Sequence, residues 1–359
     1  MKKTFYILIF IIINIDMYSQ NGTIKGFVKD ATNNEAIPFA NVFIEQINSG
    51  IATDIEGKFE FNNISSGLYN IKFSFVGYES KTYAEIIVNP NKPTVLDVKL
   101  IKSSTSLDVV EIKSSPFRKS EESPVSKRTI SATEIYRNPG GNRDISRVIQ
   151  SLPGVASTVS FRNDIIIRGG APNENRFYLD GIEIPNINHF ATQGSSGGPV
   201  GMINVNFVRE VDLYSGAFPA NRGNSLSSVM EFKQIDGNPD LIAKTLTIGS
   251  SDIGATLDGP INDKTTFVLS ARRSYLQLLF SAIGLPFLPT YNDFQFKTKT
   301  KLNDKNQITV IGIGAIDDFE LNTGINDNED DPDVIERNNY ILGYLPVTTQ
   351  WNYAVGVNW

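Results

Sequence analysis

The sequence predicts a mainly β protein in which a small α+β region separates two β regions. Short apolar runs alternate with polar residues at a period of two through much of the chain. Turn signals such as Asp54-Ile-Glu-Gly57 and Asp180-Gly181 divide these runs. Helical spacing is found between about 131 and 154. A length of 359 residues suggests two or three domains.

The composition excludes several kinds of chemistry. Cysteine is absent, so there are neither disulfides nor a lipid-anchored cysteine. His189 is the one histidine, which excludes zinc peptidases, triads with a histidine base and multi-histidine metal sites. The net charge is −6 and no dominant basic patch is present, which argues against a nucleic-acid partner. We therefore expect a protein that is not an enzyme and has no metal or cofactor site.

Residues 1–20 are typical of an export signal. Lys2 and Lys3 precede a short apolar core from Phe5 to Ile13, which is too short to span a bilayer. We expect cleavage near Ser19 or Gln20.

Residues 21–101 predict a compact β-sandwich. Ile24 and Val28 alternate with charged neighbours, and Tyr69, Ile71 and Phe73 do the same further on. The spacing of the turn signals fits about seven antiparallel strands.

Residues 102–127 predict a linker with one apolar patch. Eight serines lie between Ser103 and Ser126, a composition that cannot bury a core. The patch, Leu107 to Ile112, has two interpretations. It is either a last strand of the sandwich or an exposed segment that adds to the sheet edge of a partner.

Residues 128–235 predict a small α+β domain. Ser131-Ala-Thr-Glu134 is a capping-box pattern, and a second helix is expected from Ile145 to Leu152. The expected strands are Ile165 to Arg168, Phe177 to Leu179, Val205 to Tyr214 and Val229 to Phe232.

Residues 236–359 predict about six strands of a transmembrane antiparallel β-barrel. Phe294 and Phe296 alternate with Gln295 and Lys297, which places an apolar face toward lipid and a cationic face toward a lumen. Lysines facing a lumen suit an anionic substrate or simply keep the lumen wet. The run from Asp317 to Glu336 holds nine acidic residues and is expected to form a long loop.

Two blocks of the sequence resemble known domains. The segment from Ile165 to Pro185, with Arg168-Gly169-Gly170 and Asp180-Gly181, resembles the core of the plug domain of TonB-dependent outer-membrane receptors. Gly216 to Gly223 follows at the spacing of that family. Residues 22–100 resemble the carboxypeptidase regulatory-like domain, which implies a transthyretin-like sandwich without catalysis.

The resemblance, to receptors of the Bacteroidetes type, implies a function and a location. The plug of such receptors blocks the barrel and binds a scarce ligand such as a siderophore or a glycan. TonB, with ExbB and ExbD, then displaces the plug. The protein is therefore expected in the outer membrane, in contact with its lipid.

The resemblance also implies three groups of site residues. We expect TonB contact at Asp108, Val109, Val110, Glu111 and Ile112, plug geometry at Arg168, Gly169, Gly170, Asp180 and Gly181, and ligand-facing positions at Asn186, Asn188, His189 and Gln193. Arg168 is expected to pair with carboxylates of the barrel. For His189 a hydrogen-bonded structural role stays open beside ligand contact.

Six strands are too few for a barrel, because the smallest outer-membrane barrels have about eight and plugged transporters about 22. We therefore expect the chain to be the amino-terminal part of a receptor. The alternative is a secreted or periplasmic β-sandwich binding module without transport activity.

Overall fold

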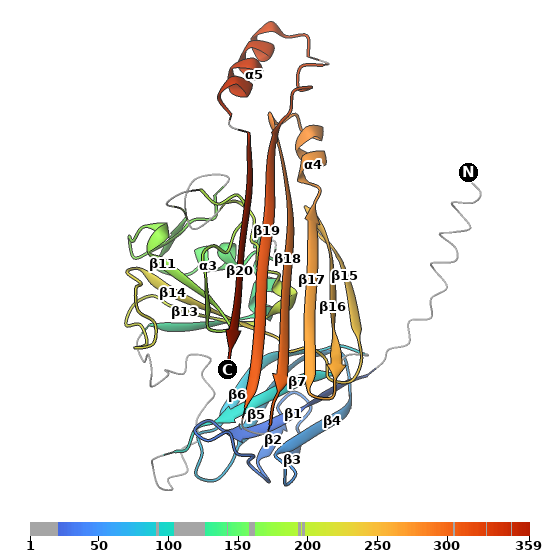
Figure 1. Ribbon diagram of the computed structural model, residues 1–359. Coiled ribbons are helices and arrows are strands. Elements are labelled where there is room, and N and C mark those ends of the chain that lie inside the picture. The colour runs from blue at the N-terminus through green and yellow to red at the C-terminus, as the bar shows by residue number, and fades with distance from the viewer. Residues whose placement is uncertain are drawn as a thin grey trace, which may run out of the picture. The chain divides into compact units, whose positions relative to one another are not determined.

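The computed structural model describes residues 21–90, 93–103, 126–141, 143–157, 162–192, 195, 198–303, 306–327, 329–345 and 347–359. The chain divides into two compact units, residues 1–109 and 110–359. Their strands and helices are labelled in Figure 1.

The first unit is a β-sandwich of two sheets, with strand orders β4-β1-β7 and β3-β2-β5-β6. Its strands are β1 (Gly22–Asp30), β2 (Asn41–Ile44), β3 (Ser49–Ala52), β4 (Lys58–Ile64), β5 (Gly67–Ser74), β6 (Lys81–Val88) and β7 (Thr94–Leu100). The seven strands agree with the prediction, but β1 and β7 run parallel to each other. A period of two tells which face a side chain occupies, and it does not tell in which direction the neighbouring strand runs.

The core of the sandwich lies between the two sheets. Ile24 and Val28 on β1 are fully buried, as are Ile71 and Phe73 on β5. Strand β1 alternates strictly between buried and half-buried residues, as its sequence predicts. Gly26 lets β7 come close, since a Cβ atom there would lie 1.9 Å from the carbonyl oxygen of Leu96.

Replacing Gly26 by Ala should therefore destabilise the sandwich by about 1–3 kcal/mol, the usual cost of overpacking a dense core. Gly67→Ala is the matched control, because the nearest atom to a Cβ at Gly67 lies 3.6 Å away, at ordinary contact distance. Hydrogen exchange of sandwich peptides across a urea series, on the full chain, measures the free energy of local unfolding. Equal stability of the two variants would contradict the close approach.

The second unit contains a mixed α+β domain. Its five-stranded sheet has the order β12-β11-β14-β13-β8, in which β11 and β14 are parallel and the other neighbours antiparallel. Its elements are β8 (Lys127–Ser131), α2 (Ala132–Arg137), α3 (Ile145–Gln150), β9 (Val155–Ser157), β10 (Ile165–Ile167), η1 (Pro172–Glu174), β11 (Asn175–Leu179), β12 (Ile182–Ile184), η2 (Val205–Phe207), β13 (Val208–Tyr214) and β14 (Ser228–Gln234).

Local hydrogen bonds explain where the elements of this domain begin. The Ser131 side chain accepts a hydrogen bond from the backbone N–H of Glu134, so the predicted cap of α2 is present. The predicted strand from Val205 was wrong over its first three residues. There the Asn204 side chain accepts from the N–H of Asn206 and caps a 3₁₀ turn, and β13 begins only at Val208.

The rest of the second unit is a long antiparallel sheet whose strands pair in chain order, from β15 to β20. Its strands are β15 (Ala243–Ile248), β16 (Asp252–Asn262), β17 (Thr265–Ser274), β18 (Phe287–Lys301), β19 (Gln307–Leu321) and β20 (Thr348–Asn358). The six strands agree with the prediction, and the sheet resembles part of a barrel. One face contacts the α+β domain, whose core includes Ile311, Ile313 and Ala315 of β19.

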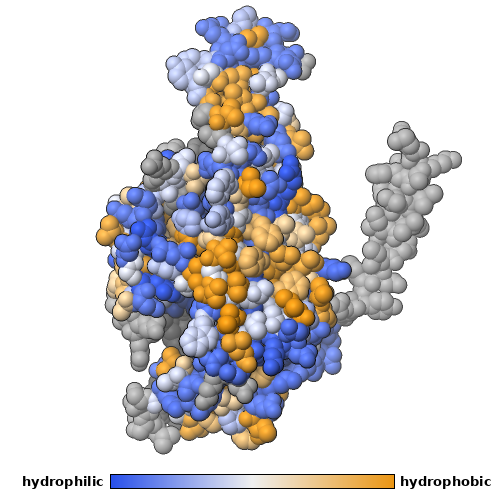
Figure 2. Space-filling view, in the orientation of Figure 1, coloured by the Kyte–Doolittle hydropathy of each residue, from blue (hydrophilic) through white to orange (hydrophobic). Residues whose placement is uncertain are grey.

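The opposite face of the long sheet is apolar and exposed. Figure 2 shows hydrophobic side chains gathered over these strands. Phe294, Ile316, Trp351 and Val355 are among the large hydrophobic residues exposed there. Gln295 and Lys297, which alternate with the exposed phenylalanine on β18, are buried. The alternation therefore divides the sheet into an apolar outer face and a polar inner face, as expected.

Two helices connect the long strands, α4 (Leu276–Ala282) and α5 (Pro332–Tyr344). The prediction of one long acidic loop was wrong at both ends. Asp317 to Leu321 complete β19, and α5 begins at Pro332. The Asp331 side chain caps α5 by accepting from the N–H of Asp333, because carboxylates are favoured at a helix N-terminus. In the described part of the chain no helix is long and apolar enough to cross a membrane.

Candidate functional site

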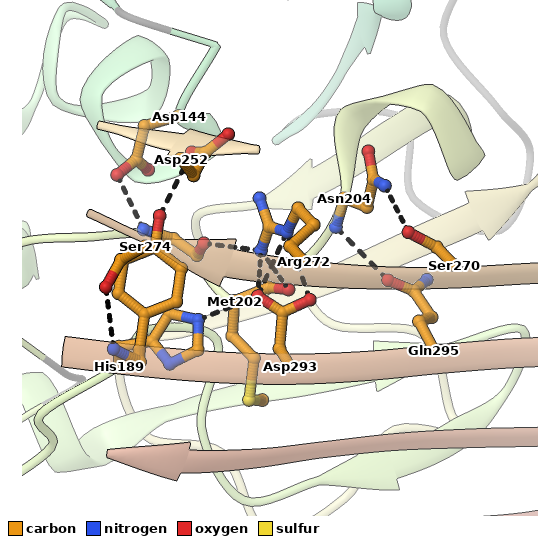
Figure 3. Close-up of polar contacts among 12 residues, drawn as sticks. Asp144, His189, Met202, Asn204, Asp252, Ser270, Arg272, Ser274, Asp293 and Gln295 are labelled. Atoms are coloured by element: carbon orange, nitrogen blue, oxygen red, sulfur yellow. Dashed lines mark hydrogen bonds and ion pairs between the residues drawn. The ribbon is translucent and has the colours of Figure 1, made fainter. Parts of the chain in front are cut away.

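The candidate site is the seam where the α+β domain meets the inner face of the long sheet. A loop from 185 to 204, of which residues 185–192, 195 and 198–204 are described, joins β12 to η2, and its described residues contact strands β17, β18 and β19. Figure 3 shows how its side chains meet those of the sheet. The seam combines buried polar contacts with the apolar packing of Ile311, Ile313 and Ala315 against the domain core.

His189 is the centre of the seam and is fully buried. Its Nδ1 lies 2.7 Å from Oδ1 of Asp317 on β19, and its Nε2 lies 3.1 Å from Oδ2 of Asp293 on β18. The imidazole also stacks on Tyr291, with ring centroids 4.1 Å apart. The N–H of Phe190 donates to the second oxygen of Asp317 at 2.7 Å. A single loop position thus contacts two strands at once.

Arg272 of β17 completes this cluster from the sheet. Its Nε donates to both carboxylate oxygens of Asp293 at 3.0 Å. Its Nη2 donates to the carbonyl oxygens of Gly201 and Met202 in the loop, at 3.0 and 2.8 Å. The guanidinium therefore holds the loop backbone and the strand carboxylate together (Figure 3). We call Arg272, Asp293, Asp317 and His189 the histidine clasp.

Neutral hydrogen bonds continue the seam beside the clasp. The N–H of Asn204 donates to Gln295 Oε1 at 3.1 Å, and its side-chain amide donates to Ser270 Oγ at 2.7 Å. On the sheet itself, the Tyr291 hydroxyl donates to Asp252 at 3.0 Å. These bonds fix the end of the loop before β13 begins.

The clasp favours the charged form of its histidine. Burial alone would lower the pKa of His189, but the hydrogen bonds to Asp293 and Asp317 outweigh it and raise the pKa above its ordinary value. Both carboxylates are nearly inaccessible to solvent. Buried carboxylates need such paired partners to remain ionised.

A second charged cluster joins the domain to β18. The ammonium of Lys297 lies 3.0 Å from Asp180 and 2.9 Å from Asp236, and Lys299 lies 2.7 Å from Asp236. Burial would raise the pKa of Asp236, but the two lysines hold it well below its ordinary value. Two of the lysines predicted to face inward, Lys297 and Lys299, are therefore paired with carboxylates, whereas the third, Lys301, is exposed.

The Asp180-Gly181 turn links the domain to three strands. Both residues have positive φ, of 46° and 86°, as a two-residue hairpin between β11 and β12 requires. The Asp180 side chain accepts from the N–H of Gln234, and its carbonyl accepts from the Asn358 amide of β20. With Lys297, these bonds connect the turn to β14, β18 and β20.

The Arg168-Gly169-Gly170 bend follows β10. Arg168 and Gly169 have φ values of 51° and 79°. A Cβ atom on Gly170 would lie 2.6 Å from the Ser227 hydroxyl, so this position needs glycine. The Arg168 side chain is exposed. No ion pair of Arg168 with a carboxylate is present among the described residues, and the expected contact with barrel carboxylates stays a prediction.

The predicted ligand-facing residues differ in how deeply they are buried. Asn186 is half-buried, whereas Asn188 and His189 are completely buried and face the interior. Asn188 accepts a hydrogen bond from Ser146 at 2.9 Å. For His189 the structure supports the structural alternative, since the imidazole contacts the sheet on both sides. Gln193 and the segment Asp108 to Ile112 lie outside the described residues.

Sequence reasoning missed three members of the clasp. Arg272, Asp293 and Asp317 come from separate strands, and Asp317 lies 128 positions from His189. Alternation along β18 does place Asp293 on the same face as Gln295 and Lys297, so that signal was present in the sequence. Among the described residues, no group of three or more histidine and acidic side chains is arranged to hold a metal ion.

Two domain-family models match the chain. Residues 24–112 match the CarboxypepD_reg-like domain, and residues 119–229 match the TonB-dependent Receptor Plug Domain. Both matches agree with the resemblances found in the sequence. No curated protein matches the chain.

Solved structures of receptors are also similar over part of the chain. The siderophore receptor PirA from Acinetobacter baumannii is 15% identical with a TM-score of 0.40, over 54% of this chain and 32% of its own. A variant of the ferric enterobactin receptor PfeA from Pseudomonas aeruginosa, in complex with enterobactin, is 15% identical with a TM-score of 0.43, over 66% of this chain and 39% of its own. The chain thus spans between about three and four tenths of the length of these receptors.

The lysine cluster makes a prediction about the seam. Lys297→Met should destabilise the second unit by about 1–3 kcal/mol, because it removes the ammonium partner of Asp180 and one of the two lysine partners of Asp236. Lys264→Met, at an exposed position in the turn between β16 and β17, is the control and should change stability by less than about 0.5 kcal/mol. Urea denaturation of the full chain in detergent, followed by tyrosine fluorescence, measures both. A loss of equal size in the two variants would argue against a buried ion pair.

Proposed function

We propose that the chain, whose residues 119–229 match the TonB-dependent Receptor Plug Domain, is part of a TonB-dependent receptor and acts in the TonB-driven uptake of a scarce ligand across the outer membrane. Members of this family are transporters rather than enzymes. The α+β domain is the plug of the receptor. The ligand class expected from the family is a siderophore, a glycan or a similar molecule.

The observation that supports this function is the asymmetry of the long sheet. Its outer face is apolar and exposed, which suits lipid, and its inner face bears the polar partners of the plug. A plug attached by ion pairs and hydrogen bonds can exchange these partners for water when it moves. Part of the contact is apolar, because Ile311, Ile313 and Ala315 of β19 pack in the core of the plug. The polar part of the seam suits a domain that detaches and returns.

The chain also offers a path for the pulling force. The linker enters the plug at β8, an edge strand of the plug sheet. Lys127 at the start of β8 lies 2.9 Å from Asp212 on β13, and Thr129 donates to the same carboxylate. We propose that TonB, with ExbB and ExbD, binds Asp108 to Ile112 by strand addition and pulls on this edge. The mechanism is a partner-driven switch without covalent chemistry.

A cavity supports a place for the ligand. It has a volume of about 270 Å³ and lies between plug and sheet, with Arg143, Asp144 and Arg147 on the plug side and Asp252 and Arg272 on the sheet side. We propose that part of the ligand occupies this space. A ligand there would contact both the plug and the long sheet, so its binding would change the contacts between them.

A substitution in the linker tests the proposed contact with TonB. Val110→Pro removes a backbone N–H and prevents regular strand pairing, so it should abolish capture by TonB while leaving the plug folded. The readout is disulfide cross-linking between cysteines placed singly at 105–114 of this otherwise cysteine-free chain and a cysteine in TonB, in cells that express both.

Ser115→Pro, five residues further along the linker, is the matched control and should leave the cross-links unchanged. Undiminished cross-linking of the Val110→Pro variant would show that TonB binds elsewhere. The absence of any cross-link in the single-cysteine chains that carry no proline substitution would contradict the proposed function and favour a binding module without transport activity.

A further inference from the structure

His189 lies in an environment that neutral imidazole does not satisfy. Both ring nitrogens lie within hydrogen-bond distance of a carboxylate oxygen, Asp317 on one side and Asp293 on the other. Neutral imidazole has one N–H donor and one acceptor nitrogen, so one side would place two lone pairs against each other. Imidazolium donates on both sides. The geometry therefore requires one proton more than the neutral ring carries, as in imidazolium.

The charges around the ring lead to the same conclusion. The groups that face it are Arg272 on β17, Tyr291 and Asp293 on β18, and Asp317 on β19, with Asp252 of β16 behind the tyrosine hydroxyl. Within the clasp, two carboxylates face one guanidinium and one imidazole. With a protonated histidine the four charges cancel. With a neutral histidine a net negative charge is left on carboxylates that are nearly inaccessible to solvent, which is costly.

We propose that the histidine clasp is a proton-linked attachment of the plug, in which docking of the loop from 185 to 204 onto the long sheet takes up a proton at His189. Undocking at neutral pH then releases that proton, because an imidazole in water has a pKa of about 6.5. This inference depends on the contact between plug and sheet alone. It holds whether or not the chain binds TonB, and the two fail in different experiments.

The linkage fixes the direction of the pH effect. The docked pKa of His189 is raised above its ordinary value. The contribution of the clasp to docking is therefore complete below about pH 6.5 and is lost as the pH rises through the docked pKa. Between these two values the docking constant falls by up to about tenfold per pH unit. A high pH therefore weakens the docking of the plug, and a low pH strengthens it.

The protonation state can be measured directly, because His189 is the one histidine in the sequence. Full-length protein labelled with ¹⁵N-histidine, in detergent micelles, gives a single pair of imidazole nitrogen signals in NMR spectra. We expect both nitrogens to carry protons at pH 7.5, where a free imidazole is largely neutral. One protonated and one bare nitrogen at that pH would overturn the proposal.

Docking is measured by the reactivity of a buried cysteine in the same loop. Ile187→Cys places a thiol at a buried position beside the clasp, and Val76→Cys places one at an exposed position in the sandwich. The ratio of their labelling rates removes the pH dependence of the thiol itself. We expect this ratio to rise by up to about tenfold per pH unit above pH 6.5.

His189→Gln is the control background, because glutamine fills the site and does not titrate. In it the ratio should be independent of pH. The linkage would be overturned if the ratio of labelling rates did not change with pH in the protein that carries His189. It would also be overturned if the ratio changed equally with pH in both backgrounds. If His189→Gln fails to fold, the NMR result on the unmodified protein still decides the protonation state.

Discussion

The second unit depends on one constraint, which is that charge buried between the plug and the long sheet must be paired. Asp293, Asp317 and Lys297 are nearly inaccessible, and each would be costly to bury alone. Asp317 is paired with His189 of the plug and Lys297 with Asp180, so the plug and the sheet bury these two groups together, whereas Asp293 also has Arg272 of the sheet as a partner. The loop from 185 to 204, the Asp180-Gly181 turn and the inward face of β18 all take their positions from this requirement. Packing of Ile311 and Ile313 adds apolar contact along the same seam.

Much of the fold could be predicted because it is encoded locally. The Asp180-Gly181 hairpin, the Ser131 cap and the alternation of Phe294 with Gln295 each involve residues close in sequence, and all are present. The parallel pairing of β1 with β7 could not be derived, since alternation carries no information on strand direction. Similar local signals misled at Val205, where one asparagine side chain changes the start of a strand.

The candidate site was less accessible to sequence reasoning because its partners are distant along the chain. His189 was identified as a residue of interest from its isolation in the composition, but its two carboxylates lie more than a hundred positions away. The role of Asp317 was also difficult to predict, because an acidic run follows it. A run of like charge suggests a solvated loop, and here its first member completes an inward strand face. Long-range pairing of this kind becomes evident only when the strands are in register.

The division of charges between plug and sheet has a consequence for the return of the plug. When His189 leaves, Arg272 remains beside Asp293, but Asp317 loses its imidazole partner and stands uncompensated on the sheet. Lys297 likewise loses Asp180 when the turn moves away. The vacated wall therefore carries an acidic point at one level, which favours the protonated imidazole, and a basic point at another, which is opposite in sign to the Asp180 carboxylate. Such a pattern attracts the departing domain back in one orientation and opposes a rotated or shifted one. The same charges that hold the closed state would thus guide its reassembly after each passage.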